Sequence, residues 1–355
     1  MTSPAHELRV GLIGYGLAGA VFHAPLIAAE PDLRLDAVVT SDPERQHQVR
    51  SDHPDAVVHT RIRSLLDRAD ELDLVVIASP NSTHFELASE ALDAGLPVVV
   101  DKPFTTTAAQ GRALIDKARR NELMMTVFQN RRWDNDMLTL ETVLDSGALG
   151  TVHRFESRFE RWVPTPKSTW RDQGPADEAG GVLYDLGSHL IDQALRLFGP
   201  VASVFAESDM HRPGVEVDDD TFLALAHTGG VRTHLWMSKL AAQHGPRFRV
   251  LGERAAYTKY GLDPQESALR AGHRPGDNGW GAESAELWGR LGAGEDTHPL
   301  PTESGRYEAF YAGVVRALRD GAAPPVDPAD SVAGLEIIEA ARRSVAAGSI
   351  ERPAH

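Results

Sequence analysis

Five short apolar runs, separated by segments with helical patterning, make up most of the first 128 residues. The runs lie at residues 9–13, 33–40, 74–78, 97–100 and 123–128. Nearly continuous apolar runs of this length are typical of parallel strands whose sheet is covered on both faces. The segments between them carry helix signals, such as the stop formed by Gly95 and Pro97. This alternation predicts an α/β domain, built on a doubly wound parallel sheet, over residues 8–128.

After residue 129 the strand-like segments follow one another, mostly without helices between them. They span residues 151–163, 201–207, 221–227, 231–239 and 248–257. Such a succession predicts an α+β domain over residues 129–350 with a large, mostly antiparallel open sheet. Helices are expected at residues 134–146, 185–198, 305–320 and 327–347. Residues 261–300 are rich in Gly, Pro and charge, and are expected to form an excursion outside the core.

Length and charge exclude several classes of protein. The 355 residues exceed the roughly 250–300 at which single cores stop growing, which favours two domains. The formal charge of −15, from 36 basic and 51 acidic side chains, argues against a broad nucleic-acid surface. No apolar run reaches the roughly 18–20 residues that a membrane span needs. The chain has no Cys, which excludes disulfides and thiolate metal sites and fits a cytoplasmic location.

A glycine-rich turn follows the first apolar run directly. Residues 14–19 read Gly-Tyr-Gly-Leu-Ala-Gly between a predicted strand and a predicted helix, the context in which this spacing indicates a dinucleotide site. Gly14 would permit the tight turn, Gly16 would let a pyrophosphate approach the backbone, and Gly19 would let the helix pack closely. The helix N-terminus would bind the phosphates. The first domain is therefore predicted to be of the Rossmann type. Its expected cofactor contacts in this turn are Gly14, Gly16, Leu17, Ala18 and Gly19.

The end of the second predicted strand favours NADP over NAD. An NAD site usually carries an acid about 20 residues after the glycines, where it binds the ribose, but Thr40 stands there. Thr40 and Ser41 can donate hydrogen bonds to a 2′-phosphate, and Arg45 can supply positive charge. Asp42 lies nearby, but two residues later and in the expected turn. NADP is therefore the expected cofactor, with NAD as the alternative.

Three further segments carry polar residues where ligands are expected. Residues 79–84 (Ser-Pro-Asn-Ser-Thr-His) and 101–103 (Asp-Lys-Pro) follow predicted parallel strands, whose carboxyl ends form the ligand-binding edge of such a sheet. The third segment holds Asp185 and His189, which share a helix face about 5–6 Å apart at Cβ. That spacing suits a His that exchanges a proton beside a carboxylate that orients it. Taken alone, such a pair is more often a helix N-terminal Asp with a buried structural His.

Together these motifs resemble the glucose–fructose oxidoreductase and inositol dehydrogenase family, known as Gfo/Idh/MocA. The resemblance covers the chain from Leu8 to about residue 347. It rests on Gly14–Gly19, on Ser79–Asn81 with His84, on Lys102–Pro103, and on Asp185 with His189. Residues 128–133 and 183–193 are most similar to the NADP-dependent scyllo-inositol dehydrogenase branch. The resemblance implies hydride transfer between a nicotinamide and a secondary alcohol or ketone of a cyclic polyol or sugar.

The family's functional residues carry over to matching positions of this chain. The resemblance implies that Lys102 contacts the substrate hydroxyl and the nicotinamide ribose, that His189 is the general base, and that Asp185 orients it. The further cofactor contacts that it implies are Ser79, Pro80, Asn81, His84, Lys102, Pro103, Asn130, Trp170 and Arg171. Arg158, Arg161 and Trp162 lie on a predicted strand and are candidate substrate contacts, although a sheet face buried in an oligomer explains them equally well.

Two other functions stay open. Some proteins of this fold hydrolyse glycosides with NAD by transient oxidation, although Thr40 and Arg45 point away from NAD. A non-catalytic nucleotide-sensing protein would keep the fold without needing the three catalytic candidates. No metal site is expected, because the chain has no HxxxH or HExxH pair and the three Asp at residues 218–220 fit an acidic loop tip better than a cation site.

The expected partners are a small polyol or sugar and further copies of this chain. An open sheet with one uncovered face favours a homodimer or homotetramer through the second domain, because large apolar faces are normally buried. The family resemblance implies the same assembly. Neither nucleic acid nor a membrane is an expected partner.

Overall fold

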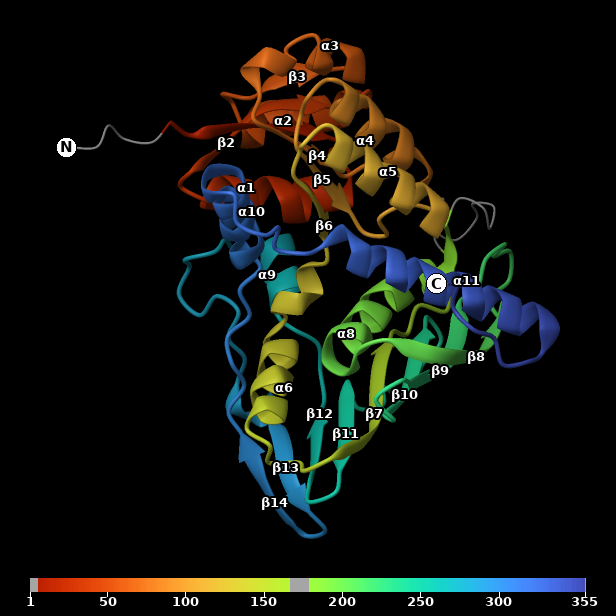
Figure 1. Cartoon of the computed structure of the whole chain (residues 1–355). Helices are drawn as coiled ribbons and strands as arrows, with labels where there is room; N and C mark the ends of the chain where they lie inside the picture. The colour runs from red at the N-terminus through yellow and green to blue at the C-terminus, as the bar shows by residue number, and fades with distance from the viewer. Residues whose placement is uncertain (1–5, 167–178, 355) are drawn as a thin grey trace.

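The computed structural model describes residues 6–166 and 179–354, and two sheets organise them (Figure 1). The first is parallel, with six strands in the order β3-β2-β1-β4-β5-β6. Its strands are β1 (Leu8–Ile13), β2 (Leu33–Val39), β3 (Val57–His59), β4 (Leu74–Ile77), β5 (Val98–Asp101) and β6 (Met125–Phe128). The predicted doubly wound sheet is confirmed. Its strand order reverses between β1 and β4, where such sheets open a crevice for a ligand.

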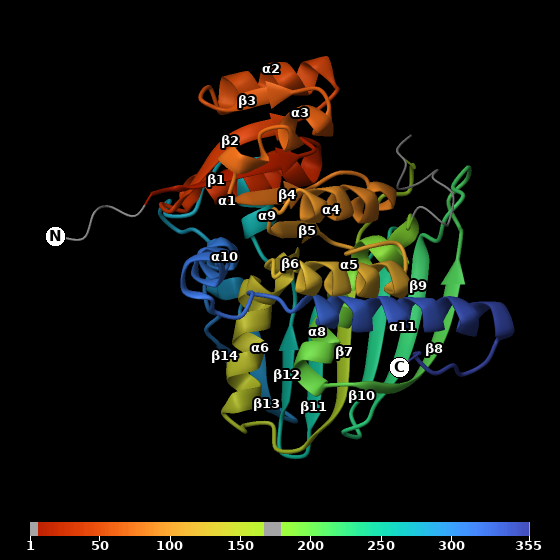
Figure 2. The ribbon, with the colours of Figure 1, turned by 45° about the horizontal axis from the view of Figure 1, so that its top comes forward.

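Helices pack on both faces of the parallel sheet (Figure 2). One face is covered by α1 (Ala24–Ala29) and α10 (Glu308–Asp320), whose apolar side chains share a core with Val10 and Leu12. The other face is covered by α3 (Ile62–Leu66), α4 (His84–Asp93) and α5 (Ala108–Arg120). The helix α2 (Pro43–Asp52) follows β2. The residues of α10 lie late in the sequence. Both halves of the chain therefore contribute helices that cover the parallel sheet.

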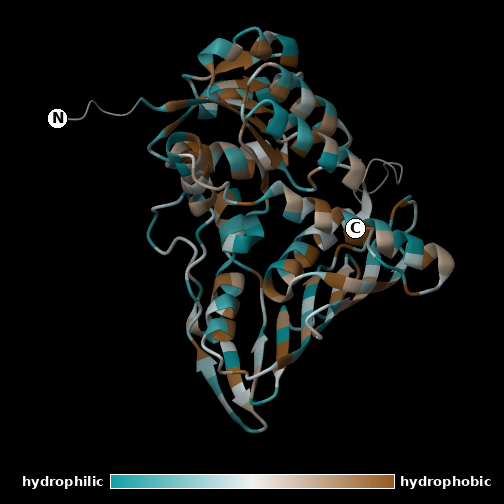
Figure 3. Ribbon diagram, in the orientation of Figure 1, coloured by the Kyte–Doolittle hydropathy of each residue, from teal (hydrophilic) through white to brown (hydrophobic). Residues whose placement is uncertain are grey.

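The second sheet has eight strands in the order β14-β13-β12-β11-β7-β10-β9-β8. They are β7 (Val152–Glu160), β8 (Val201–Asp209), β9 (Asp220–His227), β10 (Arg232–Ser238), β11 (Phe248–Gly252), β12 (Ala256–Lys259), β13 (Gly289–Ala293) and β14 (Asp296–Leu300). Among these strands, β7 and β10 pair in parallel and the other neighbours pair antiparallel. The predicted mostly antiparallel sheet is confirmed. Hydrophobic and hydrophilic bands alternate along its strands in Figure 3, as a sheet with one buried face requires.

Three helices lie on the buried face of the second sheet. They are α6 (Asn135–Asp145), α8 (Ser188–Phe198) and α11 (Pro328–Ala347). Residues 327 and 348 fix the ends of α11, because the Asp327 side chain accepts the N–H of Ala329 and Gly348 adopts the left-handed conformation. The same helix also contacts α5 of the first sheet's layer. It therefore joins the two halves of the chain.

Two expectations for the second half are wrong in detail. The predicted strand 248–257 is a hairpin of two strands, β11 and β12. Residues 261–300 are not an excursion, because they form α9 (Gln265–Arg270) and extend the sheet by β13 and β14. Their Gly and Pro residues signalled a loop, yet an edge strand such as β14 tolerates Pro299 because its outer side has no ladder to maintain.

Short helical turns connect many of these elements. They are η1 (Ala18–His23), η2 (Ala69–Glu71), η3 (Asn81–Thr83), η4 (Asn130–Trp133), η6 (Leu183–Gly187) and η7 (Ala285–Leu287). Of these, η1 and η6 are π-helical turns, which occur frequently at functional sites. Among the residues that the structure describes, no helix is long and apolar enough to cross a membrane.

Candidate active site

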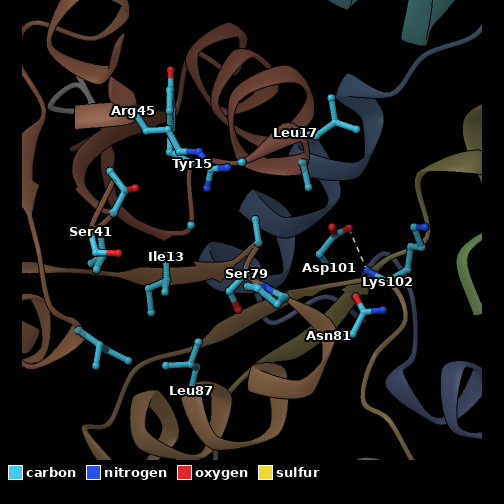
Figure 4. A pocket seen from close by; sticks show the side chains of 18 of the residues that line it. Ile13, Tyr15, Leu17, Ser41, Arg45, Ser79, Asn81, Leu87, Asp101 and Lys102 are labelled. Carbon is cyan, nitrogen blue, oxygen red and sulfur yellow. Dashed lines mark hydrogen bonds between the residues drawn. The ribbon is translucent and has the colours of Figure 1, made fainter. Parts of the chain in front are cut away.

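A cavity of about 610 Å³ lies at the carboxyl ends of the parallel strands. In Figure 4, Ser41 and Arg45 lie toward one end of it, and Asp101 and Lys102 toward the other. The loops that follow β1, β2, β4 and β5 all contribute to its wall. The predicted cofactor contacts that line it are Gly14, Gly16, Leu17, Ala18, Thr40, Ser41, Arg45, Ser79, Pro80, Asn81 and Lys102.

The glycine turn has the shape of a nucleotide cradle. A Cβ atom on Gly14 would lie 2.4 Å from the Ala78 carbonyl oxygen, and Gly14 has a φ of 98°. A Cβ atom on Gly19 would lie 2.1 Å from the Gly14 carbonyl oxygen, so the turn and the helix pack too closely for any larger residue. Gly16 instead faces the cavity, where the nearest atom to its Cβ position belongs to Arg45, at 3.7 Å. The turn therefore fits a dinucleotide phosphate as the sequence predicts.

At the end of β2, the described residues that line the cavity offer hydroxyl and guanidinium groups and no carboxylate. Asp42 caps α2, because its Oδ1 accepts the backbone N–H groups of Glu44 at 2.9 Å and Arg45 at 3.3 Å. Its Oδ2 lies 3.4 Å from Nε of Arg45. Thr40, Ser41 and Arg45 line the cavity, and Asp42 does not line it. This arrangement leaves hydroxyl groups and a guanidinium where a ribose 2′ substituent is expected.

His84 lies behind the cavity wall instead of in it. Its ring is fully buried, with Nδ1 at 2.9 Å from the Pro103 carbonyl oxygen and Nε2 at 3.0 Å from that of Ser79. Burial lowers the pKa of His84. The ring joins the turn after β4 to the turn after β5, so His84 positions both turns without reaching the cavity. Pro103, on the second of these turns, also lies outside the cavity lining.

Two hydrogen bonds join Lys102 to Asp185. Lys102 Nζ donates hydrogen bonds of 2.9 Å to both the carbonyl oxygen and Oδ1 of Asp185. Asp185 belongs to the π-helical turn η6, and His189 follows in the first turns of α8. The sequence segments 101–103 and 183–189 therefore meet at one end of the 610 Å³ cavity.

His189 is buried, and its surroundings disfavour the protonated form of its ring. Burial, together with the positive charges of Lys102 and Arg131, lowers its pKa well below 6.5, although Asp185 opposes the shift. Its Nδ1 atom is buried and has no hydrogen-bond partner among the described residues. The ring is therefore neutral at ordinary pH, which is the form that a general base requires.

A second cavity, of about 90 Å³, adjoins the Lys102 end of the first. Leu17, Ala18, Asp101, Lys102 and Asp185 line both cavities. The other residues that line the second cavity are Phe22, Phe128, Asn130, Arg131, Phe159, Arg161, Leu186, His189, Glu266 and Arg270. This polar pocket lies beside the three catalytic candidates, so it is the candidate substrate site.

The structure does not bring Arg158 and Trp162 to this pocket. Arg158 alternates with Phe159 along β7, so it lies on the open face of the sheet, where its guanidinium carbon is 3.9 Å from the centroid of a Trp236 ring. Trp162 is 54% exposed and lines neither of the two cavities. Because strand residues alternate between faces, Arg161 is the one of these three candidates that lines the pocket, together with Phe159. Trp170 and Arg171 lie outside the described residues.

The three Asp at residues 218–220 do not form an acidic loop tip. Asp218 is half-buried, and its carboxylate accepts the Leu183 N–H at 2.7 Å. Asp219 is fully buried and pairs with Arg212 at 2.9 Å. Asp218 therefore fixes the start of η6, which carries Asp185. Within the described ranges, no group of three or more His, Asp or Glu side chains could hold a metal ion.

Sequence reasoning missed several residues of the pocket. Glu266 and Arg270 come from α9, inside the segment expected to be an excursion. Arg131 follows β6 in η4, and the resemblance assigned it no role. A lone charged residue in a segment without strand or helix patterning gives no signal that it faces a site, so long-range packing alone places these side chains.

Two family models match this chain over most of its length. The model described as "Oxidoreductase family, NAD-binding Rossmann fold" matches residues 8–129, and the model described as "Oxidoreductase family, C-terminal alpha/beta domain" matches residues 142–351. The chain belongs to the Gfo/Idh/MocA family of oxidoreductases. The resemblance stated from the motifs is thus confirmed.

Members of the Gfo/Idh/MocA family match almost the whole chain. Scyllo-inositol 2-dehydrogenase (NADP(+)) IolW of Bacillus subtilis is 36% identical over 342 residues, which are 95% of this chain and 93% of the relative. The uncharacterized oxidoreductase YdgJ of Escherichia coli is 41% identical over 335 residues, 94% of this chain and 95% of the relative. The solved structure of the putative oxidoreductase yvaA from Bacillus subtilis superposes with a TM-score of 0.92 at 34% identity, covering 99% of both chains.

Proposed function

We propose that this oxidoreductase uses NADP to transfer hydride to or from a secondary alcohol or ketone of a cyclic polyol or sugar resembling scyllo-inositol. The observation that carries the proposal is the meeting of Lys102, Asp185 and His189 where the nucleotide cavity adjoins the second cavity. The similarity to IolW, which is named as an NADP(+)-dependent scyllo-inositol 2-dehydrogenase, supports it.

The protein's own residues handle the proton. A bound nicotinamide would supply the hydride chemistry. During oxidation, the neutral His189 accepts the proton of the substrate hydroxyl, and in the reverse direction the protonated ring returns it. The Lys102 ammonium stabilises the negative charge that develops on the same oxygen. Asp185 holds Lys102 at 2.9 Å and stabilises the charged form of His189.

The residues at the end of β2 support NADP as the preferred cofactor. Thr40 and Ser41 offer hydroxyl donors and Arg45 offers a charged donor to a 2′-phosphate. The carboxylate of Asp42 caps α2 and so neither binds ribose hydroxyls nor repels a phosphate at close range. NAD remains the alternative cofactor that this wall would accept less well.

A spectrophotometric assay tests the proposal. The purified protein is mixed with NADP or NAD and a panel of inositols, pentoses and hexoses, and the reduced cofactor is followed by its absorbance. We expect turnover of at least one polyol, faster with NADP than with NAD. Nucleotide binding without turnover of any polyol or ketone would favour the nucleotide-sensing alternative, and release of sugar from glycosides without net reduction would favour the glycosidase alternative.

Three further expectations from the sequence belong to the same proposal. The two halves of the chain act as a dinucleotide-binding domain over residues 8–128 and a substrate-binding and oligomerisation domain over residues 129–350. The enzyme assembles as a homodimer or homotetramer through the open face of the eight-stranded sheet. It works in the cytoplasm, without nucleic-acid or membrane partners.

A further inference from the structure

One wall of the second cavity gathers three arginines around a single carboxylate. Glu266 lies 2.7 Å from Nη2 of Arg131, 2.9 Å from Nη2 of Arg270 and 4.0 Å from Nη2 of Arg161. The four side chains come from three separate parts of the chain: η4, the end of β7 and α9. Each lines the cavity that also contains Lys102 and His189.

Arg131 and Arg270 form close ion pairs with carboxylates, whereas Arg161 does not. Arg131 is buried and also contacts Asp134 at 3.3 Å. Arg270 binds Glu266 through both Nε and Nη2, at 3.2 and 2.9 Å. The side chain of Arg161 makes no hydrogen bond with any described residue, and its guanidinium carbon lies 5.0 Å from the centroid of the Phe159 ring. Arg161 thus presents an unused pair of donors at the cavity.

The pKa values of Glu266 and His189 both reflect nearby positive charges. Although burial opposes the shift, Arg131, Arg270 and Arg161 lower the pKa of Glu266 to about 2. Burial lowers the pKa of His189 most, and the charges of Lys102, Arg131 and Arg247 lower it further, although Asp185 raises it. Two carboxylates, Glu266 and Asp134, contact three guanidinium groups, so this cluster carries one more positive than negative charge and attracts an anion.

We propose that the substrate carries an anionic group, a carboxylate or a phosphate, which binds Arg161 with help from Arg270. A guanidinium presents paired N–H donors that match the oxygens of either anion, and such charge-assisted hydrogen bonds are stronger than those to neutral hydroxyls. Arg161 is then the residue that selects an acidic sugar or polyol over its neutral parent. This inference rests on the proposed dehydrogenase function, whose substrate class it narrows.

The test compares matched neutral and anionic sugars. With NADP as cofactor, kcat/KM is measured for scyllo-inositol, D-glucose, D-glucuronate and D-glucose 6-phosphate, on the wild type and on Arg161→Gln and Arg161→Lys. The control is Arg154→Gln, because Arg154 lies on β7, pairs with Glu156 on the open face and has a side chain 39% exposed, the same fraction as Arg161. Thermal unfolding and NADP titration establish that each variant is folded.

We expect the wild type to prefer glucuronate or glucose 6-phosphate over both neutral compounds. Arg161→Gln should reduce kcat/KM for the preferred anion by about 10- to 100-fold, the size of one charge-assisted hydrogen bond, and reduce kcat/KM for the neutral compounds by a much smaller factor. Arg161→Lys should keep part of the preference, and Arg154→Gln all of it. The anion that is preferred identifies the group as carboxylate or phosphate.

The opposing outcomes separate this inference from the proposed function. Turnover of the neutral compounds at least as fast as the anions, or equal losses for both in Arg161→Gln, would overturn the inference and leave the dehydrogenase intact. If none of the compounds turns over, the dehydrogenase proposal is contradicted, and calorimetric titration of the same compounds into the NADP-saturated protein decides the inference. Tighter binding of an anion that is lost in Arg161→Gln supports it, and equal or no binding overturns it.

Discussion

The Lys102 ammonium donates hydrogen bonds to both a carbonyl oxygen and a carboxylate oxygen of Asp185. It lies where the two cavities meet, so its removal affects the reacting oxygen more than the phosphates or adenosine. We expect Lys102→Ala to abolish turnover and to leave NADP affinity within about tenfold. Steady-state rates and NADP titration measure the two effects. The matched control is Lys117→Ala, whose lysine pairs with Asp93 away from the cavities. A near-normal rate for Lys102→Ala would refute its assigned role.

His189 gives the enzyme a defined pH dependence. Burial and the nearby cations lower its pKa well below 6.5, so the ring stays neutral as pH falls through the range where an ordinary His gains a proton. We therefore expect kcat/KM for alcohol oxidation to stay constant down to below about pH 6.5 and to fall only as pH passes through the lowered pKa. His189→Gln should slow oxidation by about 100- to 10,000-fold. An acid limb centred above pH 6.5 would contradict this assignment.

Among the elements, the glycine turn contains two residues with different expected roles: Gly19 in folding and Gly16 in cofactor binding. A methyl group at residue 19 would collide with the Gly14 carbonyl oxygen, whereas a methyl group at residue 16 would meet nothing closer than 3.7 Å within the protein. We expect Gly19→Ala to lower the free energy of unfolding by about 1–3 kcal/mol. Gly16→Ala should leave the thermal midpoint unchanged and weaken NADP binding, because its methyl group would occupy the space of the pyrophosphate. Differential scanning calorimetry and NADP titration of both variants distinguish the effects, and equal stability losses would contradict this division.

The sequence predicted most elements whose signals are local. The apolar runs ending at Ile13 and Ile77 had the length and composition of buried parallel strands, and the helix that starts after Asp327 carried its own cap. The site was less predictable. Spacing brought Asp185 near His189, but the contact with Lys102 bridges 83 positions and depends on how η6 packs against the parallel sheet. The place of Glu266 in the pocket could not be predicted. It lies on the short helix α9, whose position depends on contacts with η1, a segment far away in the sequence.

For the whole molecule, the open face of the eight-stranded sheet is the expected assembly surface. Phe222, His234 and Trp236 form a cluster of ring contacts on that face, with centroids 5.1 to 6.0 Å apart. We expect the wild type to have a mass of two or four times 38.6 kDa in solution. Phe222→Asp, which places a charge in the cluster, should shift the mass toward one chain. Light scattering coupled to size-exclusion chromatography measures both, and a wild-type mass of 38.6 kDa would contradict the expectation.

The position of α10 has a consequence for how the protein is made. Phe310 packs edge-on against Phe128 of β6, and Tyr311 and Val314 belong to the same core as β1. The ribosome releases the six parallel strands long before it reaches this helix, so the nascent sheet spends most of synthesis with part of one apolar face uncovered. Exposed apolar surface on an incomplete chain is a target for aggregation and for chaperones. The sheet that carries the glycine turn is therefore completed late in synthesis. Any nonsense mutation before residue 308 would leave a first domain that cannot bury its own core.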